Sequence, residues 1–241
     1  NHNIQFFKDL FLWKRKESIP PKDEMEKTKL FVNDFFSFVE TMESSANIIS
    51  FRRHEKTELN DGTFLGIKRD PSIIGIPKKT SDFKYHIGYH SGLKRSKETI
   101  SRYYTTEIIE SSLLNEIDYG LAEGLDIHQL NEKFPNIVSC WRKGEDPKFP
   151  EGECQNDVLM RVREFLNKTL DIDKNSLIIT HLGFLRMAMF HYLNLDFKNL
   201  HKIRIEHLKG FDVLNYNEFQ SIEISNKTRK IIRKQISIKN D

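Results

Sequence analysis

Three cationic or titratable side chains stand in a row where an apolar stretch of the chain ends. The stretch NIISF, residues 47–51, is followed directly by Arg52, Arg53 and His54. Planar guanidinium groups can bind two phosphate oxygens at once, so one interpretation of this cluster is a binding site for an anion. A solvated loop at the end of a strand has the same composition. These residues alone do not decide between the two interpretations.

Three more candidate side chains each follow an apolar run further along the chain. Arg95 comes just after YHIGYHS, His181 just after SLIIT, and Glu116 just after SSLL. Each has an ordinary explanation by itself: a surface arginine, a histidine at a helix start, or a carboxylate paired with a lysine. In an open α/β sheet, however, ligands bind beyond the carboxyl ends of the strands, where helix amino termini direct free N–H groups at anions. Together these side chains predict a single anion site.

The elements that must position these side chains follow an alternating pattern from about residue 46 onward. Short apolar runs predict strands at 47–51, 85–91 and 176–181, and amphipathic stripes predict helices at 94–104, 154–169 and 183–193. Four further strand-like segments after residue 202, beginning with KIRIEH, finish the sheet or form its edge. The alternation predicts an α/β fold: a three-layer sandwich with a mostly parallel central sheet and helices on both faces.

Residues 1–45 have a different sequence pattern and are predicted to form a helical extension of a domain at 46–241. Paired prolines in the segment SIPPKD separate two helical stretches, because proline ends one helix and can start the next. Aromatic side chains crowd one side of the first stretch. That side can pack on the domain, form a homodimer or lie on a membrane surface, and packing is the favoured alternative. The edge of the sheet is a second surface through which two copies of the chain could form a homodimer.

The bulk composition argues against several classes of protein. Apolar residues make up 38% of the 241 residues and charged residues 30%, which is typical of a water-soluble globular domain. The net charge of +3 is too small to indicate nucleic-acid binding, and no apolar stretch reaches membrane-spanning length. Lys8 and Asp9 interrupt the apolar residues at the start, unlike a cleavable signal, so a cytoplasmic location is expected. Cys140 and Cys154 are expected to be free thiols.

The motifs that carry these residues occur in the order of a known family. The chain resembles the histidine phosphatase superfamily, the phosphoglycerate-mutase-like fold. The family's opening Arg-His with a following Asn is similar to Arg53, His54 and Asn60. Its later motifs are similar to four further segments of this chain: SGLKRSKETI, LLNEIDYGLAEG, PEGECQNDVLMRVREFL and ITHLGFLR. The resemblance covers roughly residues 47–216 and leaves the first 45 residues and the tail outside it.

The resemblance implies a role for each matching residue. It implies that His54 is the nucleophile that takes the phosphoryl group. The side chains implied to hold the phosphate oxygens are Arg53, Arg95, His181 and Asn60. Glu116 is implied to protonate the leaving alcohol and then to activate the attacking water. These residue types suit the chemistry, because a neutral imidazole attacks phosphorus while fixed guanidinium groups stabilise the charge that spreads over the phosphate oxygens.

The implied activity is that of a metal-independent phosphomonoesterase acting on a small phosphorylated metabolite through a phosphohistidine on His54, with no cofactor. Two alternatives stay open. One is phosphotransfer of the phosphoglycerate-mutase type, although the family's mutases carry ERHYG where this chain has EIDYG, which is closer to the phosphatase branch. The other is a weakly active or non-catalytic module that binds phosphate.

One departure from the family pattern lies next to the expected nucleophile. Glu55 stands where the family has a glycine. A carboxylate turned inward would repel phosphate, so Glu55 is expected to point away, paired with Lys56 or Arg52. By strand alternation Arg52 is itself expected to point to the other face of the sheet.

A second departure concerns a helix. The segment 73–86 contains Gly75 and Pro77 and cannot supply the helix that the family places there. One face of the sheet is therefore expected to lack its cover, and residues 1–45 are the candidates to fill the gap. Substrate selection is expected from the segment 121–150, which could form a lid containing Trp141; that ring would either join the core or stack on a ligand.

Overall fold

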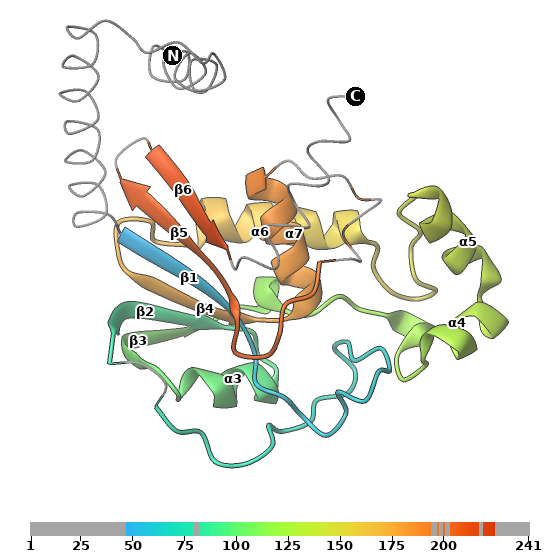
Figure 1. The fold of residues 1–241 in the computed structure, drawn as a ribbon, viewed down its shortest axis with the longest axis horizontal. Coiled ribbons are helices and arrows are strands. Elements are labelled where there is room, and N and C mark those ends of the chain that lie inside the picture. The colour runs from blue at the N-terminus through green and yellow to red at the C-terminus, as the bar shows by residue number, and fades with distance from the viewer. Residues whose placement is uncertain are drawn as a thin grey trace, which may run out of the picture. The chain divides into compact units, whose positions relative to one another are not determined.

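Six strands in the described part of the chain form one sheet in the order β3-β2-β4-β1-β5-β6 (Figure 1). The computed structural model describes residues 47–79, 82–193, 197, 200, 203–216 and 219–224. The strands are β1 (Asn47–Arg53), β2 (Lys84–His90), β3 (Tyr104–Glu110), β4 (Ser176–Thr180), β5 (Gly210–Tyr216) and β6 (Phe219–Ile224). The first four are parallel, β5 is antiparallel to β1, and β6 is antiparallel to β5. The predicted mostly parallel sheet is confirmed.

The register of the parallel strands aligns their carboxyl ends. Arg53 of β1 lies opposite Thr180 of β4, and the His54 N–H donates to the Thr180 carbonyl at 2.9 Å. On the other side of β4, His90 at the end of β2 lies opposite Ile179. The segments that leave β1, β2 and β4 therefore start at one edge of the sheet, which is where the predicted anion site requires them.

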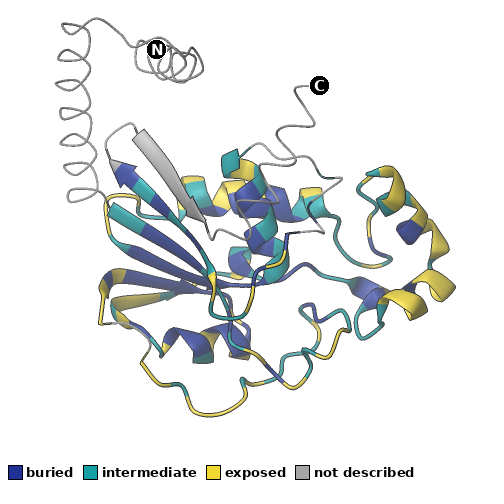
Figure 2. Cartoon of the chain, viewed as in Figure 1, coloured by how far each residue is buried: buried dark blue, intermediate teal, exposed yellow. Residues whose placement is uncertain are grey.

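Helices cover both faces of the sheet, as predicted. The helix α3 (Lys94–Ile100) lies on one face, whereas α6 (Gln155–Lys168) and α7 (Leu182–Leu193) lie on the other (Figure 1). Phe51 points toward α7 and meets the ring of Tyr192, with 6.2 Å between the ring centroids. Leu177 and Ile179 point the opposite way and pack with Ile100 of α3. Consecutive residues of β1 and β4 are buried, as the dark blue in Figure 2 shows. Because side chains alternate between the two faces of a strand, both faces of these strands are covered.

The helix expected over residues 94–104 ends at Ile100, because Tyr104 begins β3, a strand that we did not predict. The β3 segment YTTEIIE is rich in β-branched and aromatic residues, as strands are. It pairs only with β2 and forms the edge of the sheet, so much of it is exposed and its apolar signal is weak.

Two short helices, α4 (Ile127–Lys133) and α5 (Pro135–Lys143), lie between β3 and α6. The helix α4 begins with a capping box in which Asp126 and Gln129 each bind the other's backbone N–H. The helix α5 begins with a proline and ends at Gly144, whose φ of 80° is the left-handed conformation that glycine accepts. Single-turn 3₁₀ helices at Ser112–Leu114 and Gly120–Ala122 connect this part to β3.

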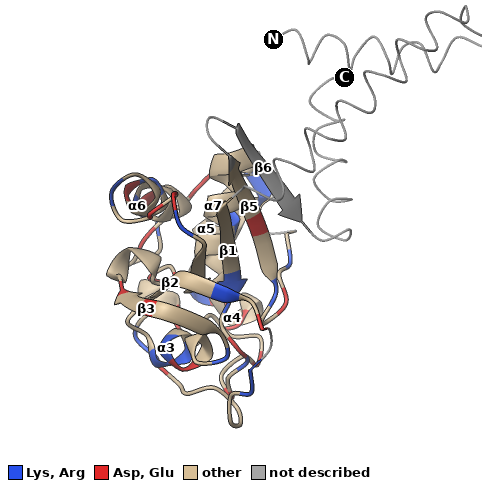
Figure 3. Ribbon diagram, turned by 90° about the vertical axis from the view of Figure 1, so that its left-hand side faces the viewer, with Lys and Arg blue, Asp and Glu red and all other residues tan. Residues whose placement is uncertain are grey.

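Between β1 and β2 the described residues contain no helix, as predicted from Gly75 and Pro77. On the face of the sheet opposite Phe51, β1 and β5 carry a polar cluster. Arg52 binds Asp212 at 2.8 Å and the Ser50 hydroxyl donates to Asp212 at 2.5 Å. Arg52 thus points to the face opposite Phe51, as expected; Figure 3 shows the blue end of β1 and the red band on β5.

Several expectations lie outside the described residues. They include the two helices and the domain assignment of residues 1–45 and the last predicted strand-like segment. The described residues all belong to one compact unit, Ala46–Asp241. None of the helices described in this unit has the length and the hydropathy that crossing a bilayer requires. Both cysteines are free, as expected.

Candidate active site

The imidazole of His54 is buried at the start of the segment that leaves β1. Its Nδ1 lies 2.6 Å from the carbonyl oxygen of Glu55. A carbonyl can only accept, so Nδ1 carries the proton and Nε2 keeps its lone pair. Burial and then the Arg95 and Arg53 guanidinium groups hold the pKa of His54 well below its usual value. The ring is therefore a neutral base at neutral pH, which is the form that can attack an electrophile.

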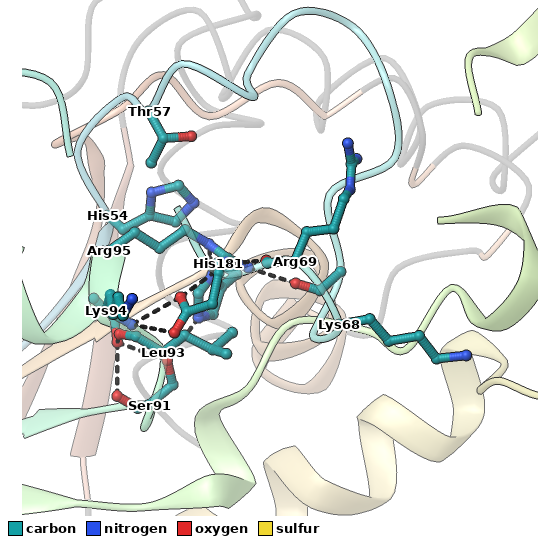
Figure 4. A network of polar contacts seen from close by, with 12 residues as sticks. His54, Thr57, Lys68, Arg69, Ser91, Leu93, Lys94, Arg95 and His181 are labelled. Carbon is teal, nitrogen blue, oxygen red and sulfur yellow. Dashed lines mark hydrogen bonds and ion pairs between the residues drawn. The ribbon is translucent and has the colours of Figure 1, made fainter. Parts of the chain in front are cut away.

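A second buried imidazole, that of His181, faces the first with 5.0 Å between ring centroids (Figure 4). Its Nδ1 accepts from Arg95 Nε at 3.3 Å, and its Nε2 lies 2.7 Å from the Ser91 hydroxyl. Because arginine cannot accept, Nε2 carries the proton and donates to Ser91. Burial, followed by the charge of Arg95, also lowers the pKa of His181 well below its usual value.

The two predicted arginines are held differently. Arg95 is fully buried at the start of α3 and donates to the carbonyls of Gly66 at 2.7 Å and Arg69 at 3.2 Å. It therefore ties the loop after β1 to His181. Arg53 donates from one terminal nitrogen to the Ile205 carbonyl at 2.8 Å, whereas its buried Nε has no hydrogen-bond partner in the described structure. A buried donor without a partner is costly and marks a place where an acceptor can bind.

Glu116 is buried beside the start of α7. Its Oε1 accepts from the backbone N–H of Gly183 at 2.9 Å and from that of Ile117 at 3.0 Å. A Cβ at residue 183 would lie 2.3 Å from this oxygen, so only glycine permits the carboxyl group to approach the helix here. Burial raises the pKa of the Glu116 carboxyl, although these hydrogen bonds and the nearby Arg95 oppose the effect. A raised pKa suits a group that must hold a proton and then donate it.

Asn60 lies in the turn that follows His54. Its side-chain oxygen accepts from the backbone N–H of Thr57 at 2.8 Å and from the Thr57 hydroxyl at 3.0 Å. Thr57 is fully buried and lies beside His54 in Figure 4. Asn60 thus shapes the turn that places Thr57. Its contact with phosphate stays a prediction.

His207 is a residue of this site that we did not predict. Its Nδ1 donates to the His54 carbonyl at 2.9 Å, and the two rings meet edge to face with 5.3 Å between their centroids. Burial and then Arg53 lower the pKa of His207. The signal in the sequence was a histidine between an apolar run and the strand at Gly210, in the segment KIRIEHLKG.

The prediction of a strand at KIRIEH, residues 202–207, was wrong for its described part, which is a loop from Ile203 to His207. The apolar side chains of Ile203 and Ile205 are buried, which explains the misleading pattern. Their carbonyls accept from Arg186 and Arg53 respectively, both at 2.8 Å, so side-chain donors replace the ladder of a neighbouring strand. The loop passes beside the site instead of joining the sheet.

A cavity of about 410 Å³ is lined in part by Ile117 and Gly183, the two residues whose N–H groups bind Glu116. It lies between α6 and α7 on one side and α4 and α5 on the other. Its aromatic lining consists of Phe64, Tyr119, Trp141, Phe149 and Phe197, and its aliphatic lining of Ile117, Ile127, Val138, Val158 and Met187. The remaining lining residues are Arg142, Gly144, Glu145, Gln155, Gly183 and Arg186. The predicted lid segment therefore forms one wall of a cavity next to the candidate site.

A sequence profile of the histidine phosphatase superfamily (branch 1) matches residues 76–225, which is more than half of the chain. The chain belongs to the histidine phosphatase superfamily. The matched range contains Arg95, Glu116 and His181, and it begins after Arg53 and His54. In this chain the superfamily's sheet brings the two segments together, because β1 pairs directly with β4.

Solved structures with this fold include phosphatases. A putative alpha-ribazole-5'-P phosphatase from Escherichia coli aligns with a TM-score of 0.60 at 17% identity, over 76% of this chain and 97% of that one. YhfR from Bacillus stearothermophilus gives 0.62 at 19%, over 75% and 98%. A phosphoserine phosphatase from Entamoeba histolytica, solved with 3-phosphoglyceric acid, gives 0.60 at 17%, over 76% and 99%. At these identities the likeness shows the superfamily's fold.

Two curated relatives are 2,3-bisphosphoglycerate-dependent phosphoglycerate mutases. The protein from Cytophaga hutchinsonii is 31% identical over 119 residues, which are 45% of this chain and 56% of that protein. The protein from Parvibaculum lavamentivorans is 29% identical over 142 residues, which are 52% of this chain and 67% of that protein. The match to the first thus spans little more than half of that mutase's length.

Glu55, which stands where the resemblance implies a glycine, points away from His54, as expected, but its partner is neither Lys56 nor Arg52. Both carboxylate oxygens of Glu55 bind the guanidinium group of Arg102, with 2.6 Å between Oε2 and Nε. The side chains are only 14% and 12% exposed. The Glu55 N–H also donates to Thr99 on α3 at 2.8 Å, which fixes the backbone next to His54. The added carboxylate is therefore neutralised outside the site.

Replacing Arg102 with alanine is expected to destabilise the fold by about 2 kcal/mol, because a largely buried carboxylate then loses its partner. In a Glu55→Gly background the same replacement should cost less than half as much. Urea unfolding of the four proteins of this cycle measures the coupling. An equal cost in both backgrounds would contradict the assignment of Arg102 as the partner of Glu55.

Proposed function

We propose that the chain is a metal-independent phosphomonoesterase that acts on a small phosphorylated metabolite through a phosphohistidine on His54. The observation that carries the proposal is the state of His54. Its proton is on Nδ1, its Nε2 is unprotonated, and its pKa is depressed by burial and two arginines. Such an imidazole stands ready as a nucleophile beside groups that bind anions.

In the first proposed step, Nε2 of His54 forms a bond to phosphorus while the bond from phosphorus to the ester oxygen breaks. The proton of Glu116 passes to the departing oxygen, which leaves as an alcohol. Arg53 and Arg95 hold the other oxygens together with His181, whose Nε2–H turns from Ser91 to an oxygen of the bound phosphoryl group. Negative charge builds up on these oxygens in the transition state, so donors fixed in advance lower the barrier.

In the second step a water attacks the phosphohistidine. The Glu116 carboxylate takes a proton from this water, the bond between nitrogen and phosphorus breaks, and inorganic phosphate leaves. His54 and protonated Glu116 are thereby restored. One carboxyl group can serve both steps because each step leaves it in the form that the next requires.

The names of the structural neighbours support hydrolysis: two are an alpha-ribazole-5'-P phosphatase and a phosphoserine phosphatase. A direct test is the release of p-nitrophenol from p-nitrophenyl phosphate by the purified chain. We expect turnover at neutral pH. Stoichiometric binding of phosphate without turnover would support the non-catalytic alternative instead.

Phosphoglycerate-mutase activity is the second candidate, since both curated relatives are mutases. A mutase returns the phosphoryl group to a second phosphoglycerate instead of to water. Incubation with 3-phosphoglycerate and 2,3-bisphosphoglycerate separates the two, because a mutase forms 2-phosphoglycerate faster than inorganic phosphate. We expect phosphate release to be the faster reaction.

Chelation of divalent metal ions is expected to leave turnover unchanged. The guanidinium groups of Arg53 and Arg95 supply the positive charge that Mg²⁺ provides in many phosphoryl-transfer sites. The measurement is kcat/KM for p-nitrophenyl phosphate before and after dialysis against EDTA, with Mg²⁺ added back as the control. Activity that is lost on dialysis and returns with Mg²⁺ would contradict the metal-independent mechanism.

A further inference from the structure

We infer that the phosphate ester cleaved at this site has a flat, apolar leaving group, such as an alcohol that carries an aromatic ring. The inference rests on the proposed function and names the class of substrate. It excludes a polyol or a small hydroxy acid as the preferred leaving group. It follows from the position and lining of the cavity beside Glu116.

The position of the cavity decides which part of the substrate occupies it. Ile117 and Gly183, whose N–H groups hold Glu116 Oε1, both line the cavity. In the proposed mechanism Glu116 delivers its proton to the departing oxygen, so that oxygen lies within hydrogen-bond distance of the carboxyl group. We therefore assign the rest of the leaving group to the cavity, which begins at the two residues that hold the carboxyl group.

The walls of the cavity are built from aromatic rings that come from separate parts of the chain. Phe64 lies in the loop after β1, Tyr119 precedes α4, Trp141 is on α5 and Phe149 precedes α6. Ring centroids are 4.9 Å apart for Phe64 and Tyr119, 5.0 Å for Tyr119 and Phe149, and 5.6 Å for Trp141 and Phe149. These rings support one another, so their faces form a preformed surface on which another ring can pack.

Most of the lining is apolar, and its polar side chains beside the rings are Arg142, Glu145, Gln155 and Arg186. Arg142 and Glu145 are exposed at the end of α5, and therefore stand at the mouth. The half-buried Arg186 donates from Nε to the Ile203 carbonyl at 2.8 Å and interacts electrostatically with Tyr119 and Glu116. A leaving group with several hydroxyls would give up its water against aromatic faces, which costs free energy for every hydrogen bond that is not replaced.

The test compares two esters whose leaving groups are both alkyl alcohols. Both leaving groups therefore need the proton of Glu116. The two esters are 2-phenylethyl phosphate and glycerol 1-phosphate. We expect kcat/KM to be roughly 10–100-fold higher for the phenylethyl ester, the range that burial of one aromatic side group typically produces. A third ester, 3-phosphoglycerate, reports on recognition of a carboxylate by Arg186, and we expect it to be no better than glycerol 1-phosphate.

Variants of Trp141 show whether the preference arises in the cavity. Trp141→Ala should reduce the ratio of the two kcat/KM values toward one, mainly through the phenylethyl ester, and Trp141→Phe should keep most of it. The glycerol ester serves as an internal control, because a general loss of folded protein lowers both values alike. Phe83→Ala is the matched control: this aromatic residue precedes β2, at the amino-terminal end of that strand. It should leave the ratio unchanged.

The outcomes separate this inference from the function on which it rests. Equal kcat/KM for the two esters, or a preference for 3-phosphoglycerate, would overturn the apolar leaving group and leave phosphatase activity standing. A ratio that persists in Trp141→Ala would overturn the assignment of the cavity. Failure to hydrolyse any of the esters would overturn the proposed function and this inference together.

Discussion

Replacing His54 with alanine is expected to abolish both turnover and the trapping of a phosphorylated intermediate. Its Nε2 is unprotonated, since Nδ1 donates to the Glu55 carbonyl. Loss of a nucleophile commonly lowers kcat by on the order of 10⁵-fold or more, because the groups that remain only bind and polarise the substrate. The measurement combines steady-state kcat with a rapid denaturing quench after mixing with a radiolabelled phosphate ester.

The trapped adduct should have the stability of a phosphohistidine: labile in acid and stable in alkali. His181→Ala should keep some label at a reduced rate, because His181 is proposed to hold oxygens and not to form the bond to phosphorus. His191→Ala, an exposed histidine on α7, is the matched control and should be labelled like the original chain. Label that persists in His54→Ala would place the nucleophile on another residue, with His207 the first to examine because its ring meets that of His54.

Replacing Glu116 with glutamine is expected to produce the second largest effect, and the effect should depend on the leaving group. Glutamine keeps an oxygen that can accept from the N–H groups of Ile117 and Gly183, but it has no proton to donate. General acids contribute about 10²–10⁴-fold, so kcat/KM for 2-phenylethyl phosphate should fall by that factor. The loss with p-nitrophenyl phosphate should be much smaller, because p-nitrophenolate leaves at neutral pH without a proton.

The comparison must use kcat/KM or pre-steady-state bursts, since attack of water on the phosphohistidine also involves Glu116 and can limit kcat for both esters. Glu123→Gln is the matched control. Glu123 binds the backbone N–H groups of Lys68 and Arg69 rather than those of α7, so its replacement should affect the two esters alike. Equal losses for the two esters in Glu116→Gln would reduce Glu116 to a positioning residue.

The shifted pKa values of His54 and Glu116 predict how kcat/KM depends on pH. The pKa of His54 is lowered, so the nucleophile stays neutral as pH falls below the usual range of histidine. The pKa of Glu116 is raised, so its proton is retained to higher pH than in an ordinary glutamate. For 2-phenylethyl phosphate, kcat/KM should therefore fall as pH rises through the pKa of Glu116. In Glu116→Gln this alkaline limb should disappear.

Local sequence was sufficient to predict β1, β2, β4, α6 and α7, although it missed β3. Arg53, Arg95 and His181 each follow an apolar run that forms a strand, and parallel pairing brings the ends of those strands to one edge. The direction of Arg52 followed from strand alternation, and Gly75 and Pro77 predicted that the described residues between β1 and β2 form no helix. These features depend on the periodicity and backbone freedom of short segments, which are properties that neighbouring residues set among themselves.

Only the tertiary structure decided the contacts that join distant segments. Glu55 binds Arg102 and not a neighbouring cation, because the carboxyl end of α3 brings Thr99 and the following Arg102 to the loop after β1. The buried isoleucines of KIRIEH lie in a loop and not in a strand. Arginine side chains donate hydrogen bonds to the carbonyls of this loop in place of a neighbouring strand. In the same way, the cavity beside Glu116 collects rings from four segments whose spacing in sequence carries no signal. Such contacts depend on how packed elements meet, and local periodicity contains no information on that.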